Sequence, residues 1–568
     1  MSDKLRQVAL GIVPAEIVLK NAKIVNVFNS TIETADIAIE EGIIAGIGNY
    51  EGRQEIDLCF SFVAPGLIDG HVHIESSMLT PSEFAKIVLP RGTTTVIADP
   101  HEIANVCGLN GIRFILDAAK TTPLEVKIMI PSCVPATAFE TSGYGLTAAE
   151  IGALKNEESI LGLGEMMDYP GLLAGRTEVI RKVEAMDKGI RDGHAPGLSG
   201  HELNAYKVMG IHTDHESTTR AEIEEKIARG FYCHLREGSA TRNLAALLPA
   251  VNQKNLSRLL FCTDDKHPGD IIREGHIDYN VNQAIQAGIA PIDAIRMATI
   301  NTAIAYQLPL LGAIAPGYQA DLIVFDSLED IKVRDVYKRG IPVVKSGKIL
   351  FETVKIRNHQ VLNTIHFNPE SIDLSLALKS DRIHVIGLEN GNVTTSDIHA
   401  SVKVKNGLYV AEENPDLWKL AVVERHHYSG RIGKALVKGF GLHQGALAMS
   451  IAHDSHNVIA IGDNDPDMLL AIKTIKGIGG GIVLVHEHDI YDYLRLEVGG
   501  IMTANDPRLV AEKITIIENK CRQMGVSKLI DPLLTLSFLS LPVIPKLKLT
   551  DRGLVDVERQ QLIPLEIN

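Results

Sequence analysis

The sequence predicts an α/β protein: a TIM-like parallel (β/α)8 barrel, β-rich segments on both flanks, and a further α+β domain after them. Three observations lead to this prediction. Between residues 65 and 311, short apolar runs typical of strands alternate with runs typical of helices. Short strand-like runs also precede residue 65 and return after residue 312. With 568 residues the chain is too long for one hydrophobic core, so two or three domains are expected.

The composition is that of an ordinary globular protein, with 45% hydrophobic and 22% charged residues. The formal net charge of -14 argues against nucleic acid or an anionic membrane as the main partner. The six cysteines show no Cys-x-x-Cys spacing, so neither a disulfide framework nor a cysteine zinc site is indicated. No apolar run approaches the roughly 20 residues that span a bilayer. Residues 1–20 lack the pattern of a signal peptide, so we expect a cytoplasmic enzyme.

The flanks of the barrel contain short strand-like runs separated by turn signals, such as Asn21 and the pair Glu41-Gly42. Before the barrel these runs are 17–19, 23–27, 36–39 and 43–47. After the barrel they are 317–325, 336–337 and 343–348. Each flank is therefore expected to supply a small β-layer.

Eight strand-like runs are expected in the barrel, and nearly every one ends in a polar or ionisable residue. The residues at these ends are His71 and His73, Asp99 to Glu102, Ser132, Glu165, His194, His215 and Glu216, Arg236 and Glu237, and Asp264 and Asp265. Helices are expected at 221–228, 282–287 and 291–306, the last with proline at its start. Because active sites of this barrel lie at the C-terminal ends of the strands, these side chains are expected to meet.

The first barrel strand contains two histidines that are separated by one residue. Side chains alternate faces along a strand, so His71 and His73 point the same way and can share one metal ion. The run 64–73, Ala-Pro-Gly-Leu-Ile-Asp-Gly-His-Val-His, resembles the first-strand motif of the amidohydrolase superfamily. Those enzymes are metal-dependent hydrolases on a TIM-like barrel, commonly with a β-sandwich built from both flanks. The resemblance implies a composite β-sandwich of residues 1–64 and 312–365, a barrel of 65–311 and a C-terminal α+β domain of 366–568.

Four imidazoles and two carboxylates at the strand ends form a candidate ligand set. They are His71, His73, Glu165, His194, His215 and Asp264. One catalytic metal ion needs fewer ligands, because it keeps a position open for water. The set therefore predicts two divalent ions bridged by Glu165, and its ligand types suit manganese, iron or zinc. Asp264 could also accept a proton from the activated water and pass it to a leaving group, so Glu165 and Asp264 are the catalytic candidates.

Strand four separates the subfamilies of this superfamily. Cyclic amidases such as dihydroorotase usually place a carbamylated lysine where this chain has Glu165. Five segments resemble the bacterial and archaeal adenine deaminases: 69–77, 98–106, 192–196, 213–217 and 262–265. This resemblance covers essentially the whole chain. It implies hydrolysis of adenine to hypoxanthine and ammonia by hydroxide activated at two metal ions, with manganese expected first and iron or zinc as alternatives.

Substrate-binding residues are less determined by the sequence. A group must hydrogen-bond or protonate N1 of the purine, and the candidates by location are His101, Glu102, Glu237 and Asp265. For His101 and Glu102 a salt bridge within a loop is the alternative. In the C-terminal domain, a polar segment at 452–457 includes Asp454 and Ser455. This segment either closes the purine pocket or is hydrogen-bonded within its own domain.

Two other functions remain open at this point. One is an amidohydrolase that acts on another ring, either a cyclic amide or a modified purine. The other is a non-catalytic binding protein on the same scaffold, although such proteins normally lose metal ligands and all six are present here. The expected partner is adenine, with no nucleic acid and no membrane. A homodimer or larger homo-oligomer is expected from the family and from the general tendency of soluble enzymes.

Overall fold

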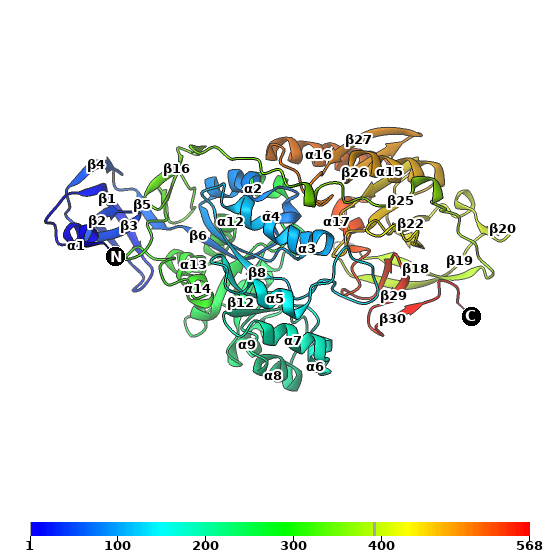
Figure 1. Ribbon diagram of the computed structural model, residues 1–568, viewed down its shortest axis with the longest axis horizontal. Coiled ribbons are helices and arrows are strands. Elements are labelled where there is room, and N and C mark those ends of the chain that lie inside the picture. The colour runs from blue at the N-terminus through cyan, green and yellow to red at the C-terminus, as the bar shows by residue number, and fades with distance from the viewer. Residues whose placement is uncertain (1, 390–392, 568) are drawn as a thin grey trace.

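The computed structural model describes residues 2–389 and 393–567, and it has three regions along its long axis (Figure 1). A β-sheet at one end, here called the flanking sheet, contains the N-terminus. The barrel lies in the middle, and the C-terminal region lies at the other end (Figure 1). The predicted α/β fold with a barrel and an additional C-terminal domain is confirmed.

Eight parallel strands form the barrel. They are β6 (Leu67–Val72), β7 (Thr93–Ala98), β8 (Glu125–Ile130), β9 (Ile160–Met166), β10 (Ile190–Gly193), β11 (Thr213–Asp214), β12 (Tyr232–Arg236) and β13 (Leu259–Cys262). They pair as a five-stranded sheet, β10-β9-β8-β7-β6, and a three-stranded sheet, β11-β12-β13. His212 N–H donates to Arg191 O (2.9 Å) between β10 and β11, and a parallel bridge joins Val72 to Asp264 beyond β13. These two links connect the sheets on both sides.

Helices pack around the strands. They are α2 (Pro81–Val88), α3 (His101–Cys107), α4 (Leu109–Ala119), α5 (Ala148–Leu154), α6 (Tyr169–Leu173), α7 (Thr177–Ala185), α8 (Gly200–Val208), α9 (Arg220–Ala228), α10 (Leu244–Leu247), α11 (Pro268–Arg273), α12 (Ile277–Gln286), α13 (Pro291–Met297) and α14 (Ile300–Ala305). The single helix predicted at 291–306 is therefore wrong, because the chain leaves the helical conformation at Thr299 (φ -139°, ψ -94°). The Thr299 hydroxyl donates to Ile295 O (2.6 Å), a bond that competes with regular helix geometry.

Both flanks of the barrel contribute to one nine-stranded sheet. Its strands are β1 (Ala15–Asn26), β2 (Thr31–Glu40), β3 (Ile43–Gly48), β4 (Gly52–Asp57), β5 (Phe62–Pro65), β14 (Leu322–Phe325), β15 (Asp335–Lys338), β16 (Ile341–Lys345) and β17 (Lys348–Ile349), with α1 (Asp3–Ala9) beside them. Antiparallel pairing of β5 with β14 joins the two flanks. The turn predicted at Asn21 is instead an irregularity within β1, where the register to β2 shifts and Asn21 has φ 55°. Asparagine tolerates this left-handed conformation better than most residues.

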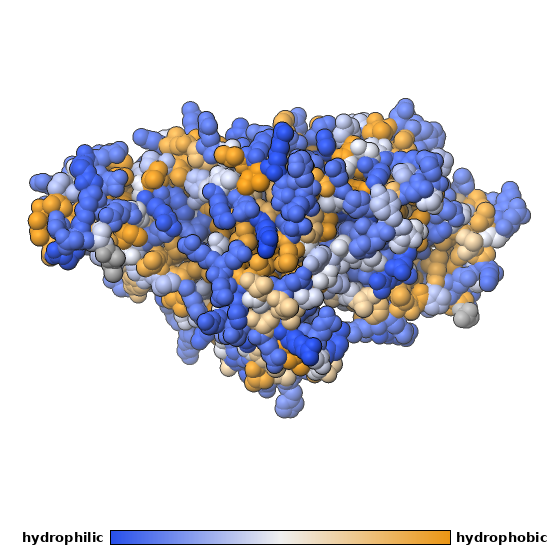
Figure 2. All heavy atoms as spheres, in the orientation of Figure 1, coloured by the Kyte–Doolittle hydropathy of each residue, from blue (hydrophilic) through white to orange (hydrophobic). Residues whose placement is uncertain are grey.

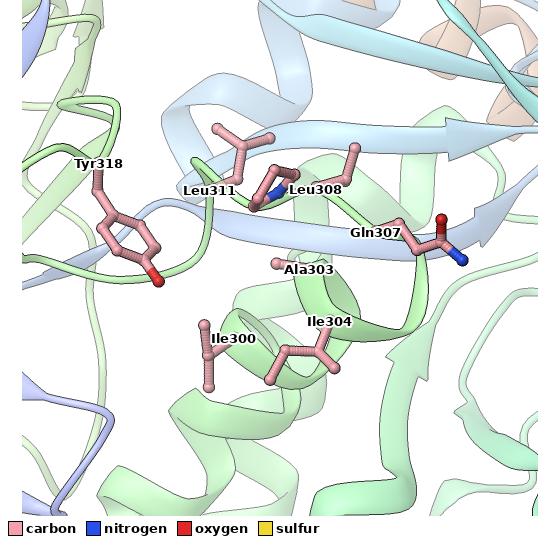
Figure 3. Close-up of a pocket in the computed structure, with 8 residues that line it drawn as sticks. Ile300, Ala303, Ile304, Gln307, Leu308, Leu311 and Tyr318 are labelled. Carbon is pink, nitrogen blue, oxygen red and sulfur yellow. The ribbon is translucent and has the colours of Figure 1, made fainter. Parts of the chain in front are cut away.

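An apolar cavity of about 300 Å³ lies between α14, the turn at 307–311 and Tyr318 (Figure 3). Aliphatic side chains such as Ile300, Ile304 and Leu308 line it. The described residues around this cavity include no carboxylate, imidazole or thiol that could bind a metal ion. The chemistry of the protein must therefore be sought elsewhere.

The C-terminal region contains an eight-stranded sheet in the order β19-β18-β23-β22-β25-β24-β26-β27. Its elements are β18 (Arg382–Leu388), β19 (Thr395–Ser401), β20 (Val404–Lys405), β21 (Leu408–Tyr409), β22 (Leu417–Val423), β23 (Ile432–Lys438), β24 (Gly445–Met449), β25 (Val458–Gly462), α15 (Asp465–Ile478), β26 (Gly481–His486), β27 (Asp489–Arg495), α16 (Pro507–Gln523), α17 (Pro532–Phe538), β28 (Leu547–Thr550), β29 (Gly553–Asp556) and β30 (Gln561–Ile563). Helix α15 packs on strands β24, β25 and β26 of the sheet.

The C-terminal region is joined to the barrel by apolar packing and by backbone hydrogen bonds. One continuous hydrophobic cluster includes barrel residues such as Leu79 and C-terminal residues such as Met502. Thr80 N–H donates to Thr503 O (3.1 Å), and Thr503 N–H donates to Met78 O (2.9 Å). The loop that follows the histidine strand β6 is therefore fixed by the C-terminal region.

The surface has no large apolar face on the side that Figure 2 shows, where hydrophilic and apolar residues are interspersed along the whole length. Among the described helices, none has both the length and the hydropathy that a membrane span requires.

Candidate active site

Glu165 lies between two pairs of imidazoles at the C-terminal ends of the barrel strands. Its Oε1 is 3.4 Å from His73 Nε2 and 3.8 Å from His71 Nε2. Its Oε2 is 2.7 Å from His194 Nδ1 and 3.3 Å from His215 Nε2. Each carboxylate oxygen thus faces one imidazole pair, and all five side chains are buried or nearly so. The side chains around Glu165 therefore form candidate metal-binding groups.

Asp264 completes the cluster from the end of β13. Its Oδ1 lies 3.1 Å from His73 Nε2 and 3.8 Å from His71 Nε2. Asp264 has a φ of 58°, which is uncommon for a residue other than glycine, although aspartate is among the residues that adopt it. Its backbone N–H donates to His71 O (3.0 Å) and its carbonyl accepts from His73 N–H (3.3 Å). The backbone of the histidine strand therefore holds this conformation.

The donor atoms of the cluster fit divalent metal ions. His73 Nδ1 lies 2.9 Å from Asp99 O, so Nδ1 carries the proton and Nε2 presents a lone pair. His71 Nε2 lies only 3.2 Å from His73 Nε2, a convergence of ring nitrogens that suits a shared cation. Burial, with His215 and His73 nearby, holds the pKa of His71 well below its ordinary value. His71 is thus neutral, as a metal ligand must be.

Hydrogen bonds around Glu165 fix its position on β9. Glu165 N–H donates to Asp99 Oδ2 (2.9 Å), and Ser132 Oγ donates to Glu165 O (2.5 Å). A Cβ atom on Gly164 would lie 2.1 Å from Asp99 Oδ2, so only glycine allows this close approach. The sequence Gly164-Glu165 therefore brings this carboxylate to its place.

A buried ion pair supports the loops that hold His194 and His215. Lys226 Nζ donates to Asp214 Oδ2 (2.7 Å) and to Ala195 O (2.8 Å). Ala195 N–H in turn donates to Asp214 Oδ1 (3.0 Å). Asp214 precedes His215 and Ala195 follows His194, so one ammonium group on α9 ties both ligand loops together.

Arg236 was not singled out from the sequence, yet its guanidinium group lies in the cluster. It donates to Asp264 Oδ2 (2.6 Å) and also to Glu216. Burial alone would raise the pKa of Asp264, but the Arg236 guanidinium group holds it well below its ordinary value. Asp264 is therefore ionised, and one of its two oxygens is occupied by Arg236.

Glu237, which the sequence suggested as a substrate ligand, is not brought to the cluster. It accepts from Leu244 N–H (3.2 Å) and lies 3.8 Å from Arg242. Side chains alternate along a strand, so at the end of β12 Arg236 shares the inner face with His234. Applied to β12, the same alternation that identified His71 and His73 would have favoured Arg236 over Glu237.

Three other predicted residues lie beside the cluster. His101 Nδ1 is 3.3 Å from Glu165 Oε1, and His101 Nε2 is 3.4 Å from Glu102 Oε1. Asp265 is half-buried and accepts a hydrogen bond from Ser76 Oγ. His101 is thus next to the Glu165 carboxylate, Asp265 follows Asp264, and Glu102 lies one residue further out.

Glu102 connects the barrel to the C-terminal region through two histidines. His453 Nδ1 lies 2.6 Å from Glu102 Oε1, and His456 Nε2 contacts Glu102 Oε2. Ala452 N–H donates to His456 Nδ1 (3.2 Å), so the proton of His456 is on Nε2 and is donated to Glu102. A protonated Nε2 cannot ligate a metal ion. We therefore describe Glu102, His453 and His456 as a hydrogen-bonded interdomain clamp and not as a third metal site.

The segment 452–457 that carries this clamp reaches the barrel. Asn457 Nδ2 donates to Thr141 O (2.9 Å) in the loop after β8. Asp454 and Ser455 are buried, and Asp454 Oδ2 and Ser455 Oγ have no hydrogen-bond partner among the described residues. The contacts of this segment are thus not confined to its own domain.

The interdomain clamp leads to a prediction about stability and pH. Burial alone would lower the pKa of His453, but the charge and hydrogen bond of Glu102 raise it to about 9. The unfolded-state pKa is about 6.5, so this stabilisation is complete below about pH 6.5 and is lost as pH rises through about 9. We expect His453→Gln to lower the free energy of unfolding by about 3 kcal/mol at pH 6. In urea titrations the difference from wild type should shrink by pH 10.

The matched control is His384→Gln, which removes a half-buried imidazole from its pair with Asp397 in the C-terminal sheet. A pair near the surface contributes about 0–1 kcal/mol, so this variant should stay close to wild type. A His453→Gln effect as small as that of the control, or one independent of pH, would contradict the charged clamp.

Known proteins resemble this chain over nearly its whole length. The sequence profile described as "Amidohydrolase family" matches residues 62–350, and the profile described as "Adenine deaminase C-terminal domain" matches residues 392–561. A curated adenine deaminase from Clostridium acetobutylicum is 48% identical over 554 residues, 97% of each chain. Adenine deaminase 2 from Carboxydothermus hydrogenoformans is 46% identical over 566 residues, 99% of each chain. An adenine deaminase from Geobacillus kaustophilus is 46% identical over 559 residues, 97% of each chain.

Proposed function

The chain belongs to the amidohydrolase family and, within it, to the adenine deaminases, and from this premise we propose how its residues act in the hydrolysis of adenine to hypoxanthine and ammonia. The observation that supports the proposal best is the position of Glu165, whose Oε1 faces His73 and whose Oε2 faces His194 and His215. Such a ligand set accommodates two cations and leaves positions for water.

Two divalent ions would be held by the six predicted ligands. Glu165 Oε1, His71, His73 and Asp264 would hold one ion, and Glu165 Oε2, His194 and His215 would hold the other. When bound, such ions supply a water molecule of lowered pKa and hence a nucleophile at neutral pH. Imidazole and carboxylate ligands suit manganese, iron or zinc, and manganese remains our first prediction.

Asp264 is proposed to move the proton. Its Oδ2 accepts from Arg236 (2.6 Å), so the other oxygen, Oδ1, is directed to the side of His73. An ionised carboxylate in this place can take a proton from the attacking water and give it to the departing amine. Arg236 acts as a positioning residue, because it keeps Asp264 ionised and orients it.

The purine is proposed to bind between the cluster and the segment 452–457. Two groups next to Glu165 and Asp264 could donate a proton to N1: the buried His101 and the half-buried Asp265. Burial alone would lower the pKa of His101, yet Cys133 and Glu102 beside it keep it well above its ordinary value. His101 can donate from either ring nitrogen, since Nδ1 lies 3.3 Å from Glu165 Oε1 and Nε2 lies 3.4 Å from Glu102 Oε1. Asp454 and Ser455 would lie at the C-terminal side of the bound base.

The test of this function is the conversion of adenine by the purified chain, followed by the absorbance change to hypoxanthine and by ammonia release. We expect turnover with about two metal ions per chain, loss of turnover on chelation, and recovery when manganese is added back. If the chain binds metal ions but does not convert adenine, adenine is rejected as the substrate, and a metal-dependent hydrolase with another substrate remains the proposal. A chain that binds no metal ion would reject the ligand assignment itself.

Assembly into a homodimer or larger oligomer and location in the cytoplasm stay predictions. Size-exclusion chromatography with light scattering tests the first of them. A membrane or nucleic-acid partner is not part of the proposal.

A further inference from the structure

Three acidic side chains, each with one oxygen that lacks a hydrogen-bond partner among the described residues, are buried where the barrel meets the C-terminal region. Glu140 lies in the loop after β8, Asp454 in the segment 452–457, and Asp551 in the turn between β28 and β29; their exposed fractions are 4%, 2% and 3%. Glu140 Oε1, Asp454 Oδ2, Ser455 Oγ and Asp551 Oδ2 have no hydrogen-bond partner among the described residues. Buried polar atoms are nearly always bonded, so four orphaned oxygens in one region indicate a place prepared for a ligand.

This region is next to the catalytic cluster. Asp454 Oδ1 lies 3.9 Å from His453 Nδ1, and that same nitrogen lies 2.6 Å from Glu102 Oε1, so Asp454 is connected to the residues beside the cluster. After burial, the charge of Asp454 acts most on the pKa of Glu140, so Glu140 lies near the segment 452–457. Asn457 and Thr141, which follow these residues closely in sequence, are hydrogen-bonded to each other (2.9 Å). This hydrogen bond holds the loop after β8 against the segment 452–457.

The carboxyl groups of Glu140 and Asp454 cannot both be charged at low cost. Burial first, and then the charge of Asp454, raise the pKa of Glu140 well above its ordinary value. A neutral carboxylic acid offers one O–H donor and one carbonyl acceptor side by side. A carboxylate would offer acceptors only.

Adenine has a complementary edge. Its reacting carbon C6 must face the metal ligands, and the ring atoms farthest from C6 are N3, an acceptor, and N9–H, a donor. A neutral acid can pair with both at once, donating to N3 and accepting from N9–H. On the basis of the proposed function, we propose that the carboxyl group of Glu140 binds the N3 and N9 edge of adenine and thereby selects the free base over N9-substituted purines.

The experiment compares adenine with 9-methyladenine and 3-deazaadenine as substrates of the metal-loaded wild type, Glu140→Gln and Glu140→Ala. Wild type should prefer adenine to 9-methyladenine by 10³-fold or more in kcat/KM, on the order expected where a buried partner is left unpaired. Glutamine keeps one donor and one acceptor, so Glu140→Gln should stay within about 10-fold of wild type on adenine. Glu140→Ala should raise KM for adenine by about 10- to 100-fold and reduce the preference by a similar factor.

Controls separate this inference from the proposed function. Glu158→Ala, an exposed glutamate after α5, should behave as wild type, and the metal content of every variant should stay at two. If wild type is active on adenine but Glu140→Ala keeps the full preference against 9-methyladenine, the inference fails and the function stands. If Glu140→Gln raises KM for adenine as much as Glu140→Ala does, a paired donor and acceptor at this position do not bind adenine, and the proposed contact is wrong.

The substrate analogues test the same contact in the unmodified protein. 3-Deazaadenine lacks the N3 acceptor, so wild type should bind it with a KM at least about 10-fold higher than that of adenine. An equal KM would overturn the contact even if the alanine variant does not fold. A metal-loaded wild type that does not act on adenine at all would overturn the function and this inference together.

Discussion

Replacement of Asp264 by asparagine is expected to lower kcat for adenine by about 10²- to 10⁴-fold while both metal ions stay bound. Asparagine keeps an oxygen that can remain beside His73, where Asp264 Oδ1 now lies at 3.1 Å. It cannot accept and return a proton, so the amine leaves without general-acid assistance. The measurement is steady-state turnover together with metal analysis of the same preparation.

Asp270→Asn is the matched control, because Asp270 lies six positions later in α11 and bonds to Ser239 and Arg242 outside the cluster. It should retain turnover within a few-fold of wild type. Near-wild-type kcat in Asp264→Asn would reject the proton-transfer role. Loss of metal in Asp264→Asn would instead show that Asp264 acts chiefly as a ligand.

Replacement of Glu165 by glutamine is expected to remove the second metal ion and essentially all turnover. An amide can offer only one oxygen, whereas Glu165 now presents Oε1 to His71 and His73 and Oε2 to His194 and His215. Loss of a residue that hydrogen-bonds to a metal ligand typically weakens metal binding by about 10- to 100-fold. Loss of a ligand that bridges two ions should therefore weaken metal binding by at least about 100-fold. Metal titration by calorimetry and metal content after dialysis measure this loss.

Glu178→Gln on the exposed side of α7 provides the control for the same chemical change. It should bind two ions and turn over normally. Two ions and full turnover in Glu165→Gln would reject the bridging role. Glutamine has nearly the same volume as glutamate, so the metal-free variant should unfold at nearly the same temperature as metal-free wild type. A much lower unfolding temperature would show that the loss of metal comes from misfolding.

The barrel and its ligand residues could be predicted because their signals are local. Alternation along a strand puts His71 and His73 on one face, and the barrel places strand ends together whatever their separation in sequence. Asp264 and Glu165 follow apolar runs and needed no knowledge of distant residues. These predictions need only the two-residue alternation of side chains along a strand and the rule that strand ends meet at one face of the barrel.

Features that depend on distant residues were not predictable in the same way. Glu102 and His453 are 351 positions apart, and no pattern in either segment indicates the other. Glu140 lies in a loop without periodicity, and its surroundings come from β28, β29 and the segment 452–457. The helix break at Thr299, where φ is -139° and ψ is -94°, interrupts a segment whose sequence pattern is helical throughout. Arg236 is the exception, because a local rule would have found it.

The pairing of β5 with β14 constrains how the chain can be made. Ser61 and Asp326, which are hydrogen-bonded at this junction, are 265 positions apart in the sequence. At roughly 5–20 residues per second, the ribosome needs roughly 15 to 50 s to deliver the partner of β5. During that interval β5 emerges with its edge unpaired, an arrangement that invites pairing with other chains. Nascent copies on one messenger are therefore most exposed to cross-pairing until β14 is made, after the last barrel strand, and slower synthesis lengthens that period.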